Sequence, residues 1–257
     1  MAAAITVYVM PAYYRSAATI VPANPVLADK ARLFNKNIRE LYSYFGSGDD
    51  LDRIYGVAEM GSIYQKLADE FSMVNYYQLT GDSLSLLRRK AVKQLRKDIN
   101  LRKTDKDQLI IEVWTKDKQL SADIVNHMVT LIEQTESRVW LQHYQQSVEK
   151  LKVAIAEKEQ QYTLLKDSLQ RVNASQKELL SAQLTGLLEQ LKQYRIAEDE
   201  FILAIQTPPA VLYVLETAAP AAKAERPDKL AVLIATGLVS FVFICLLVLV
   251  NDRKQSA

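Results

Sequence analysis

The sequence predicts an α+β membrane protein with a small membrane-proximal sheet, a long extended helical hairpin and a C-terminal transmembrane helix. Three observations lead to this fold class. The run 230–250 is apolar and uncharged, and a helix of its length covers the roughly 30 Å hydrocarbon core of a bilayer. Three short segments are rich in β-branched and aromatic residues, which is typical of strands. Apolar residues at heptad spacing extend on both sides of one break within 120–206.

The run 230–250 is bounded by Lys229 on one side and by a short polar tail, 251–257, on the other. A buried helix of a soluble protein is rarely so long and so uniformly apolar, so we interpret the run as membrane-spanning. Basic residues flank both ends, and the positive-inside rule therefore does not decide the orientation. Small residues predict faces for close packing against another membrane helix, namely Ala231 and Ala235, or Gly237 and Ser240.

Residues 1–10 are also uncharged and apolar, but they have about half the length needed to span a membrane. They lack a basic region, which argues against a signal peptide. Two interpretations remain open: a stub of a first membrane helix that is truncated or absent in this chain, or the lead-in to the following strand. We favour the membrane stub, because Pro11 separates the apolar run from an extended segment.

The segment 11–119 is predicted to form a membrane-proximal α/β base that residues 209–217 complete. Its expected strands are 13–21 and 109–115, and the second is so apolar that it should lie inside the sheet. The expected third strand, 210–216, opens the segment 207–229, which continues as a stiff linker rich in alanine and proline. Amphipathic spacing predicts helices in the base at 26–45, 51–58, 62–78 and 82–101.

The segment 120–206 is predicted to be a long helix and a return helix. The break is expected within 171–176, where Ser175 and Glu178 match the pattern of a capping box. Apolar residues at alternating steps of three and four predict a seam between the two helices. Its members are Leu141, Tyr144, Val148, Leu151, Ile155, Leu180, Leu184, Leu187 and Leu191.

Basic residues cluster between Arg88 and Lys106, where nine lysines and arginines face only Asp98 and Asp105. They indicate either a surface for anionic polymers or lipid head groups, or a solvated helix face. We favour the solvated face, because the helix carries no interleaved aromatics and no glycine-rich phosphate loop. The whole chain has 32 basic and 30 acidic residues, and this balance argues against a nucleic-acid partner.

The sequence contains no motif of a phosphate loop, a dinucleotide fold, a hydrolase nucleophile or a zinc protease. His127 and His143 are 16 positions apart on one predicted helix, about 24 Å, and cannot share a metal ion. The single cysteine, Cys245, excludes an intrachain disulfide. We therefore predict that the chain is not an enzyme and has no catalytic residues, no cofactor and no metal site.

Four segments, in this order, resemble the Wzz-type polysaccharide co-polymerases, the chain-length determinants of bacterial surface polysaccharides. The first is PAYYRSAATI, which begins at Pro11, and the second is LIIEVWTKDKQLSADIVNHM, in which the family's recurring Ala and Asn correspond to Ala122 and Asn126. The third is LYVLETAAP, and the fourth is the proline segment with Pro220 and Pro227. The chain departs from the family in its first membrane helix, in a further proline of that last segment, and at Lys118, where the family usually has proline.

The resemblance implies a non-enzymatic regulator of the chain length of O-antigen, capsule or exopolysaccharide. It implies a homo-oligomer in the bacterial inner membrane with most of the chain in the periplasm. The expected partners are membrane lipid, a polysaccharide polymerase or exporter, and the glycan itself. Two alternatives remain: a membrane-anchored coiled-coil protein with a structural or tethering role, and a partner of a capsule-export tyrosine kinase.

Overall fold

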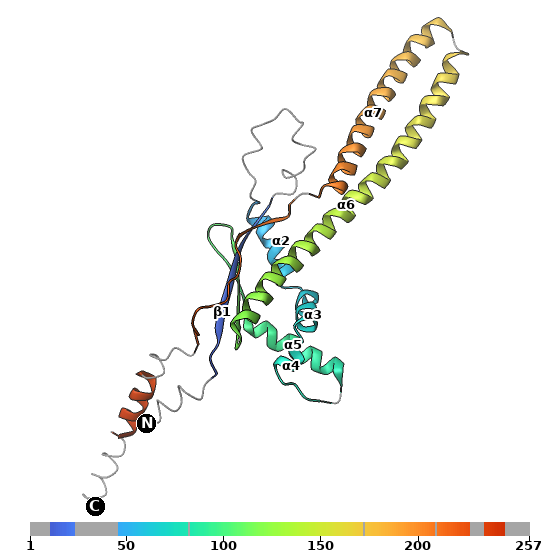
Figure 1. The fold of residues 1–257 in the computed structure, drawn as a ribbon. Helices are drawn as coiled ribbons and strands as arrows, with labels where there is room; N and C mark the ends of the chain where they lie inside the picture. The colour runs from blue at the N-terminus through green and yellow to red at the C-terminus, as the bar shows by residue number, and fades with distance from the viewer. Residues whose placement is uncertain are drawn as a thin grey trace, which may run out of the picture. The chain divides into compact units, whose positions relative to one another are not determined.

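The structure, a computed structural model, describes residues 11–23, 46–81, 83–171, 173–208, 210–226 and 234–244. It combines a four-stranded sheet, several short helices and a long helical hairpin (Figure 1), which confirms the predicted α+β class. The expected stub 1–10 and the expected helix 26–45 lie outside the described residues. So do both ends of the expected membrane helix, 230–233 and 245–250, and the tail 251–257.

The strands are ordered β2-β3-β1-β4 in the sheet. β3 pairs antiparallel with β1, where Tyr14 lies opposite Thr115, and antiparallel with β2 on its other side. The predicted internal position of the strand 109–115 is thereby confirmed. The strand bounds are Tyr14–Pro22 for β1, Ile99–Lys103 for β2, Leu109–Thr115 for β3 and Leu212–Glu216 for β4.

β2 was not predicted from the sequence, which favoured one helix as far as residue 101. Helix α5 (Leu84–Asp98) ends at Asp98, and Ile99 is already extended. Ile99 is buried, whereas Asn100, Arg102 and Lys103 are exposed. The basic end of the predicted helix is therefore an edge strand, and exposed lysine and arginine side chains are usual on such edges.

Three helices, α5 and the two that precede it, form a small core beside the sheet. Leu67, Met73 and Leu95, one from each helix, have no exposed surface. The expected helix 62–78 is interrupted because Ser72 has a φ of 49° and starts a new turn. The bounds of these helices and of α2 are Gly48–Ala58 for α2, Gly61–Glu70 for α3 and Met73–Tyr76 for α4.

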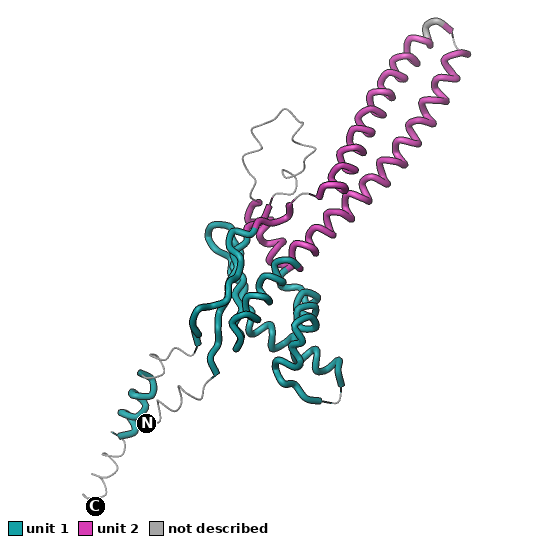
Figure 2. The backbone as a smooth tube through the Cα atoms, in the orientation of Figure 1, with its two compact units in different colours: residues 1–20, 58–130, 214–257 teal, residues 21–57, 131–213 magenta. Residues whose placement is uncertain are grey.

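The chain divides into two compact units, coloured separately in Figure 2. The first consists of residues 1–20, 58–130 and 214–257, and the second of 21–57 and 131–213.

The helical hairpin of the second unit consists of α6 (Lys118–Leu169) and α7 (Ala174–Gln206); α6 contributes its residues up to Thr130 to the first unit. The 52 residues of α6 correspond to about 78 Å of helix. The break, residues 170–173, overlaps the predicted segment 171–176. The predicted capping box is wrong, because Asn173 is the N-cap of α7 and Ser175 lies inside the first turn.

Candidate functional site

The linker 217–226 lies along the sheet of the first unit, and its far end pairs with the residue that precedes β1. Tyr13 and Arg226 form an antiparallel bridge. The amide of Tyr13 donates to the carbonyl oxygen of Arg226 at 2.9 Å, and that of Glu225 donates to the carbonyl oxygen of Tyr13 at 2.8 Å. We call this bridge, with the side chains that fasten the linker around it, the junction.

The near end of the linker is held by Asn126 of α6. Its side-chain amide donates to the carbonyl oxygen of Ala218 at 2.9 Å and accepts the Ala218 amide hydrogen at 2.9 Å. A primary amide supplies both a donor and an acceptor, so the Asn126 side chain binds both backbone groups of Ala218, as the backbone of a neighbouring strand would. Ala122, one turn earlier, is buried, and the small side chain lets α6 approach its surroundings closely. These contacts give a physical role to both residues that the family resemblance singled out.

Ser16 adds a buried polar contact next to this clamp. Its hydroxyl donates to the carbonyl oxygen of Ala219 at 2.9 Å and lies 2.8 Å from the hydroxyl of Ser121. Both serines are almost fully buried. Because buried polar groups are costly without partners, this network fixes the position of the linker against β1 and α6.

Arg15 joins a buried and an exposed carboxylate. Its guanidinium lies 2.5 Å from Glu112, which is 6% exposed, and 3.4 Å from Glu225. Asn100 also donates to Glu112, at 3.0 Å. Burial opposes ionisation of Glu112, but the hydrogen bonds from Arg15 and Asn100 and the charge of Arg15 outweigh it and lower the pKa of this carboxyl.

Trp114 completes the junction on the outer side. Its indole nitrogen donates to Glu225 at 3.3 Å, and the guanidinium of Arg226 lies over its ring, 4.4 Å from the centroid. Glu225 and Arg226 are therefore held by side chains as well as by the backbone bridge. The junction thus consists of a clamp at Ala218, an ion pair at Arg15 and an aromatic contact at Trp114.

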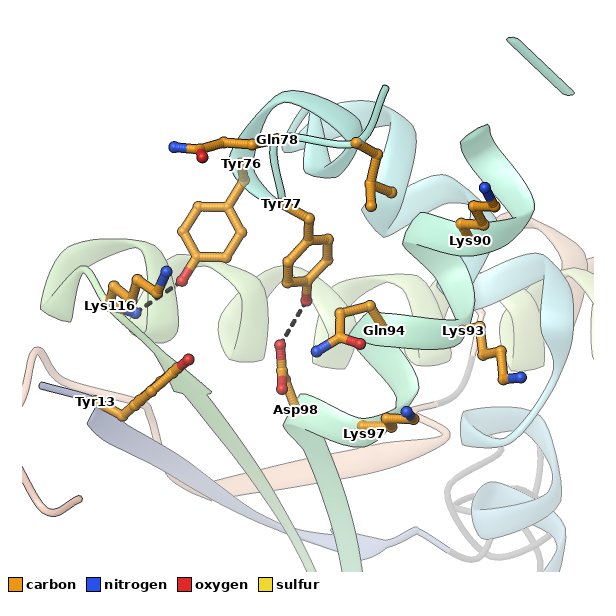
Figure 3. A pocket seen from close by; sticks show the side chains of 11 residues that line it. Tyr13, Tyr76, Tyr77, Gln78, Lys90, Lys93, Gln94, Lys97, Asp98 and Lys116 are labelled. Atoms are coloured by element: carbon orange, nitrogen blue, oxygen red, sulfur yellow. Dashed lines mark hydrogen bonds between the residues drawn. The ribbon is translucent and has the colours of Figure 1, made fainter. Parts of the chain in front are cut away.

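A pocket of about 510 Å³ opens beside Tyr13, and Figure 3 shows tyrosine and lysine side chains around it. We call it the tyrosine–lysine pocket. The hydroxyl of Tyr76 accepts a hydrogen bond from the backbone amide of Lys116 at 2.7 Å, and the hydroxyl of Tyr77 donates to Asp98 at 2.7 Å. Burial raises the pKa of all three side chains, those of Tyr76, Tyr77 and Asp98.

The turn that carries the two tyrosines has an unusual backbone. Gln78, which lines the pocket directly after them, has a φ of 53°, a left-handed conformation that residues other than glycine seldom adopt. The Tyr76 and Tyr77 rings meet edge to face at 5.0 Å. Such strain is retained where surrounding contacts enforce it, and it frequently marks functional positions.

The predicted basic cluster is divided by the fold. Lys90, Lys93 and Lys97 line the tyrosine–lysine pocket. Arg88 pairs with Asp69 at 3.0 Å, and Arg96 lies over the Tyr64 ring at 4.5 Å. Aromatic residues do lie beside these lysines, but they come from other segments of the chain. They are Tyr13, Tyr76 and Tyr77. No local pattern in the basic helix signals them.

Some predicted site residues fall at the edge of the described chain. Pro220 is exposed within the linker, whereas Pro227 and Ala231 lie outside the described residues. Ala235, Gly237 and Ser240 lie on a helical stretch, 234–244, that is largely exposed. Over the ranges that the structure describes, no helix combines the length and the apolar character needed to cross a membrane.

The nine predicted seam residues face the interior of the hairpin to different degrees. Tyr144, Val148, Ile155, Leu184 and Leu191 are buried, and Leu141, Leu151, Leu180 and Leu187 are half-buried. The Tyr144 ring packs against Phe201 of α7 at 5.7 Å. Other apolar side chains of the same helices point away from this seam, among them Leu164, Leu179 and Leu188, which are 60%, 64% and 49% exposed.

The two histidines lie in separate surroundings. His127 approaches Glu70 at 2.7 Å and meets the edge of Phe71, and His143 lies beside Trp140. Among the residues that the structure describes, no three His, Cys, Asp or Glu side chains are close enough to hold a metal ion together.

No protein-family model matches the sequence, and no curated protein matches it. Solved structures of polysaccharide co-polymerases are similar to this chain, and they are of the class that the sequence resembles. A full-length bacterial polysaccharide co-polymerase is 12% identical, with 100% of this chain and 91% of that chain covered and a TM-score of 0.48. A fragment of the co-polymerase WzzB from Salmonella Typhimurium is 8% identical, with coverages of 84% and 100% and a TM-score of 0.43. A mutant of the Shigella flexneri lipopolysaccharide O-antigen chain-length regulator is 11% identical, with coverages of 83% and 100% and a TM-score of 0.37.

Proposed function

We propose that this chain regulates the length of a bacterial surface polysaccharide, as a non-enzymatic co-polymerase that acts beside a separate polymerase or exporter. The observation that carries the proposal is the junction. Because Tyr13 and Arg226 are bridged, the chain before Pro11 and the chain after Arg226 leave the sheet from one place. The sequence on both sides is apolar: residues 1–10 before it, and the run 230–250 after it.

A sheet whose two ends leave together suits a domain that rests on a membrane. In this proposal 230–250 spans the bacterial inner membrane, 1–10 is part of a second membrane leg, and the bulk of the chain is periplasmic. Pro220 and Pro227 stiffen the linker between the sheet and the membrane. Ala231, Ala235, Gly237 and Ser240 are then available for close packing of the membrane helices.

The junction also explains why the linker is fastened so firmly. A linker without contacts to the sheet would let the sheet change its orientation above the membrane. The Asn126 clamp and the Arg15–Glu225 pair instead fix the linker to β1 and α6. The base would consequently keep a defined orientation at the bilayer, as an assembly that controls a growing polymer requires.

The hairpin supports a homo-oligomeric form. Leu164, Leu179 and Leu188 expose apolar surface on helices whose seam is already filled. We propose that these exposed leucines contact other copies of the chain, and that the assembly meets the glycan and the polymerase or exporter.

The proteins with similar structures are described as polysaccharide co-polymerases and as a regulator of O-antigen chain length, and this is the role that we propose for the chain. The chain contains none of the catalytic motifs sought in its sequence. We propose that it acts through position and assembly, without cofactor or metal.

Deletion of the gene in the bacterium that carries it tests the proposal. Surface glycans separated on a gel should lose their preferred length or shift to another, and the plasmid-borne chain should restore it. An unchanged length distribution contradicts the proposal and favours the tethering role. Loss of the entire polymer favours a partner of a capsule-export tyrosine kinase.

A further inference from the structure

The tyrosine–lysine pocket is strongly biased towards anions. Four lysines line it, Lys90, Lys93, Lys97 and Lys116, against the single carboxyl of Asp98. None of the four ammonium groups forms an ion pair with another described residue. The pocket thus presents a net charge of about +3 to whatever enters it.

The one carboxyl at the pocket is already engaged. Asp98 accepts the hydroxyl hydrogen of Tyr77 at 2.7 Å, and in Figure 3 its side chain points towards that hydroxyl. The charges of Lys97 and Lys116 act on Asp98 from a distance, but among the described residues neither lysine forms an ion pair with it. The lysine ammonium groups therefore remain available to a ligand.

The types of side chain point to phosphate. Lysine is a compact point charge with three rotatable donors, and it suits the tetrahedral oxygens of a phosphate group. Gln94 and the Tyr13 hydroxyl add neutral polar groups at the wall. A neutral sugar would leave the mutual repulsion of the lysine charges unchanged, whereas the negative charge of a phosphate offsets this repulsion.

The position of the pocket points to a lipid. Tyr13, two residues after Pro11, lines the pocket and forms the bridge with Arg226. If the apolar segments on both sides of the junction enter the membrane, a step that rests on the proposed function, the pocket opens near the level of the head groups. The occupant is then a phosphate carried by a lipid.

We propose that the tyrosine–lysine pocket binds the phosphate of an anionic membrane lipid through Lys97 and Lys116, with Lys90 and Lys93 at its rim. Tyr76 and Tyr77 form the wall opposite Tyr13. Asp98 holds Tyr77 in place and limits the affinity by its own negative charge. Bound lipid would thereby couple α5 and the Tyr76–Gln78 turn to the bilayer surface.

The test uses the full chain purified in detergent and mixed with equal amounts of phosphatidylglycerol and phosphatidylcholine. Native mass spectrometry measures how much of each lipid the protein retains. We expect preferential retention of phosphatidylglycerol, and a reduction of about tenfold in the Lys97→Gln/Lys116→Gln variant. The variant Lys150→Gln/Lys177→Gln, which loses the same charge from exposed hairpin positions, should retain lipid like the wild type.

Asp98→Asn separates recognition from structural damage. The asparagine oxygen can still accept from Tyr77, while the negative charge beside the lysines disappears. We expect tighter retention of phosphatidylglycerol, by several-fold, an effect that a loosened fold does not produce. Titration with inorganic diphosphate distinguishes the sources: binding of lipid supports the proposal, and binding of diphosphate alone overturns the assignment to a lipid.

Equal retention of the two lipids by the wild type, or unchanged retention in Lys97→Gln/Lys116→Gln, overturns the proposal. The glycan length distribution of the same variants is measured separately. If the deletion strain makes glycan of normal length while lipid retention depends on the lysines, the lipid site is supported and the proposed function is contradicted. If the chain controls glycan length but retains no lipid selectively, the proposed function is supported and the lipid site is contradicted.

Discussion

The backbone amide of Tyr13 donates a hydrogen bond to the carbonyl oxygen of Arg226 at 2.9 Å, so the two ends of the first unit's sheet meet. The bridge brings the residues next to Pro11 and the end of the linker together at the sheet. Every membrane-related part of the proposed function depends on this pairing.

Cysteines at positions 13 and 226 should form an intramolecular disulfide. Residues of a hydrogen-bonded antiparallel pair have Cα atoms about 5.5 Å apart, within the range that a disulfide bridges. The variant Tyr13→Cys/Arg226→Cys is made with Cys245→Ala, which removes the only native cysteine. Mass spectrometry of non-reduced peptides should find the two cysteines linked within one chain.

The control pair is Tyr13→Cys with Lys106→Cys. Lys106 lies in the turn between β2 and β3. Tyr14 pairs with Thr115 at the opposite end of β3, so Tyr13 and Lys106 are about 20 Å apart. It should give no intramolecular link. Linkage of the control pair as readily as the test pair contradicts the strand register.

Replacements of Asn126 that remove either the donor or the acceptor of its amide should destabilise the fold. In Asn126→Asp, a carboxylate oxygen takes the place of the donor and faces the carbonyl oxygen of Ala218. We expect a loss of about 1–3 kcal/mol in the free energy of unfolding, because a partly buried acceptor loses its donor and meets a negative charge. Chemical denaturation of the purified chain measures it.

The matched control for the clamp is Gln193→Glu on α7. It makes the same change from amide to acid at an exposed position, and Gln193 donates only to Glu189 there. Surface changes of this kind usually remain within about 0.5 kcal/mol. Equal losses in the two variants would show that Asn126 does not hold the linker.

Glu112 should make the stability of the fold sensitive to acid. Its pKa lies below the ordinary value of 4.5 in the folded chain, so its contribution is complete above that value and is lost as the pH falls through the lowered pKa. In Glu112→Gln the free energy of unfolding should decline less steeply in this acid range. At neutral pH the variant should be about 1–3 kcal/mol less stable, because Arg15 loses the buried one of its two carboxylate partners.

Glu159→Gln is the comparison for Glu112. The Glu159–Arg195 pair has the same 2.5 Å separation, but both side chains are well exposed. Exposed ion pairs contribute about 1 kcal/mol or less. A pH profile of thermal unfolding that Glu112→Gln leaves unchanged would argue against the Arg15–Glu112 interaction.

Leucines of α7 should separate folding from assembly. Leu184 is 9% exposed in the hairpin seam, and Leu179 is 64% exposed. Leu184→Ala should cost about 2–5 kcal/mol in stability, because it removes buried methyl groups and leaves a cavity. Leu179→Ala should leave thermal unfolding nearly unchanged but reduce the mass of the assembly in sedimentation velocity. An assembly of unaltered mass would remove Leu179 from the contact between copies.

Regular patterns in the sequence were sufficient for the elements with a single dominant face. The strand 109–115 was predicted with the bounds that β3 has, because apolar and β-branched residues surround its one charged residue, Glu112. The break between α6 and α7 overlaps the predicted segment 171–176, whose residues are mostly polar. These features depend on neighbouring residues alone.

The elements that were missed depend on tertiary contacts. Ile99 continues the four-residue apolar spacing of α5, yet Ile99–Lys103 pairs with β3, so the sheet overrides the helical pattern. The tyrosine–lysine pocket draws on Tyr13, on α4 with the turn after it, and on α5, whose proximity no spacing rule reveals. The family resemblance singled out Asn126 but not its partner. Only the fold shows that Asn126 binds Ala218.

The length distribution of the surface glycan in a deletion strain is the most direct test of the central claim. The strain is complemented with the wild-type chain and with Asn126→Asp, at matched protein levels. Our account predicts that deletion removes the preferred length, that the wild type restores it, and that Asn126→Asp restores it poorly. A glycan pattern that is the same in all of these strains would contradict the account.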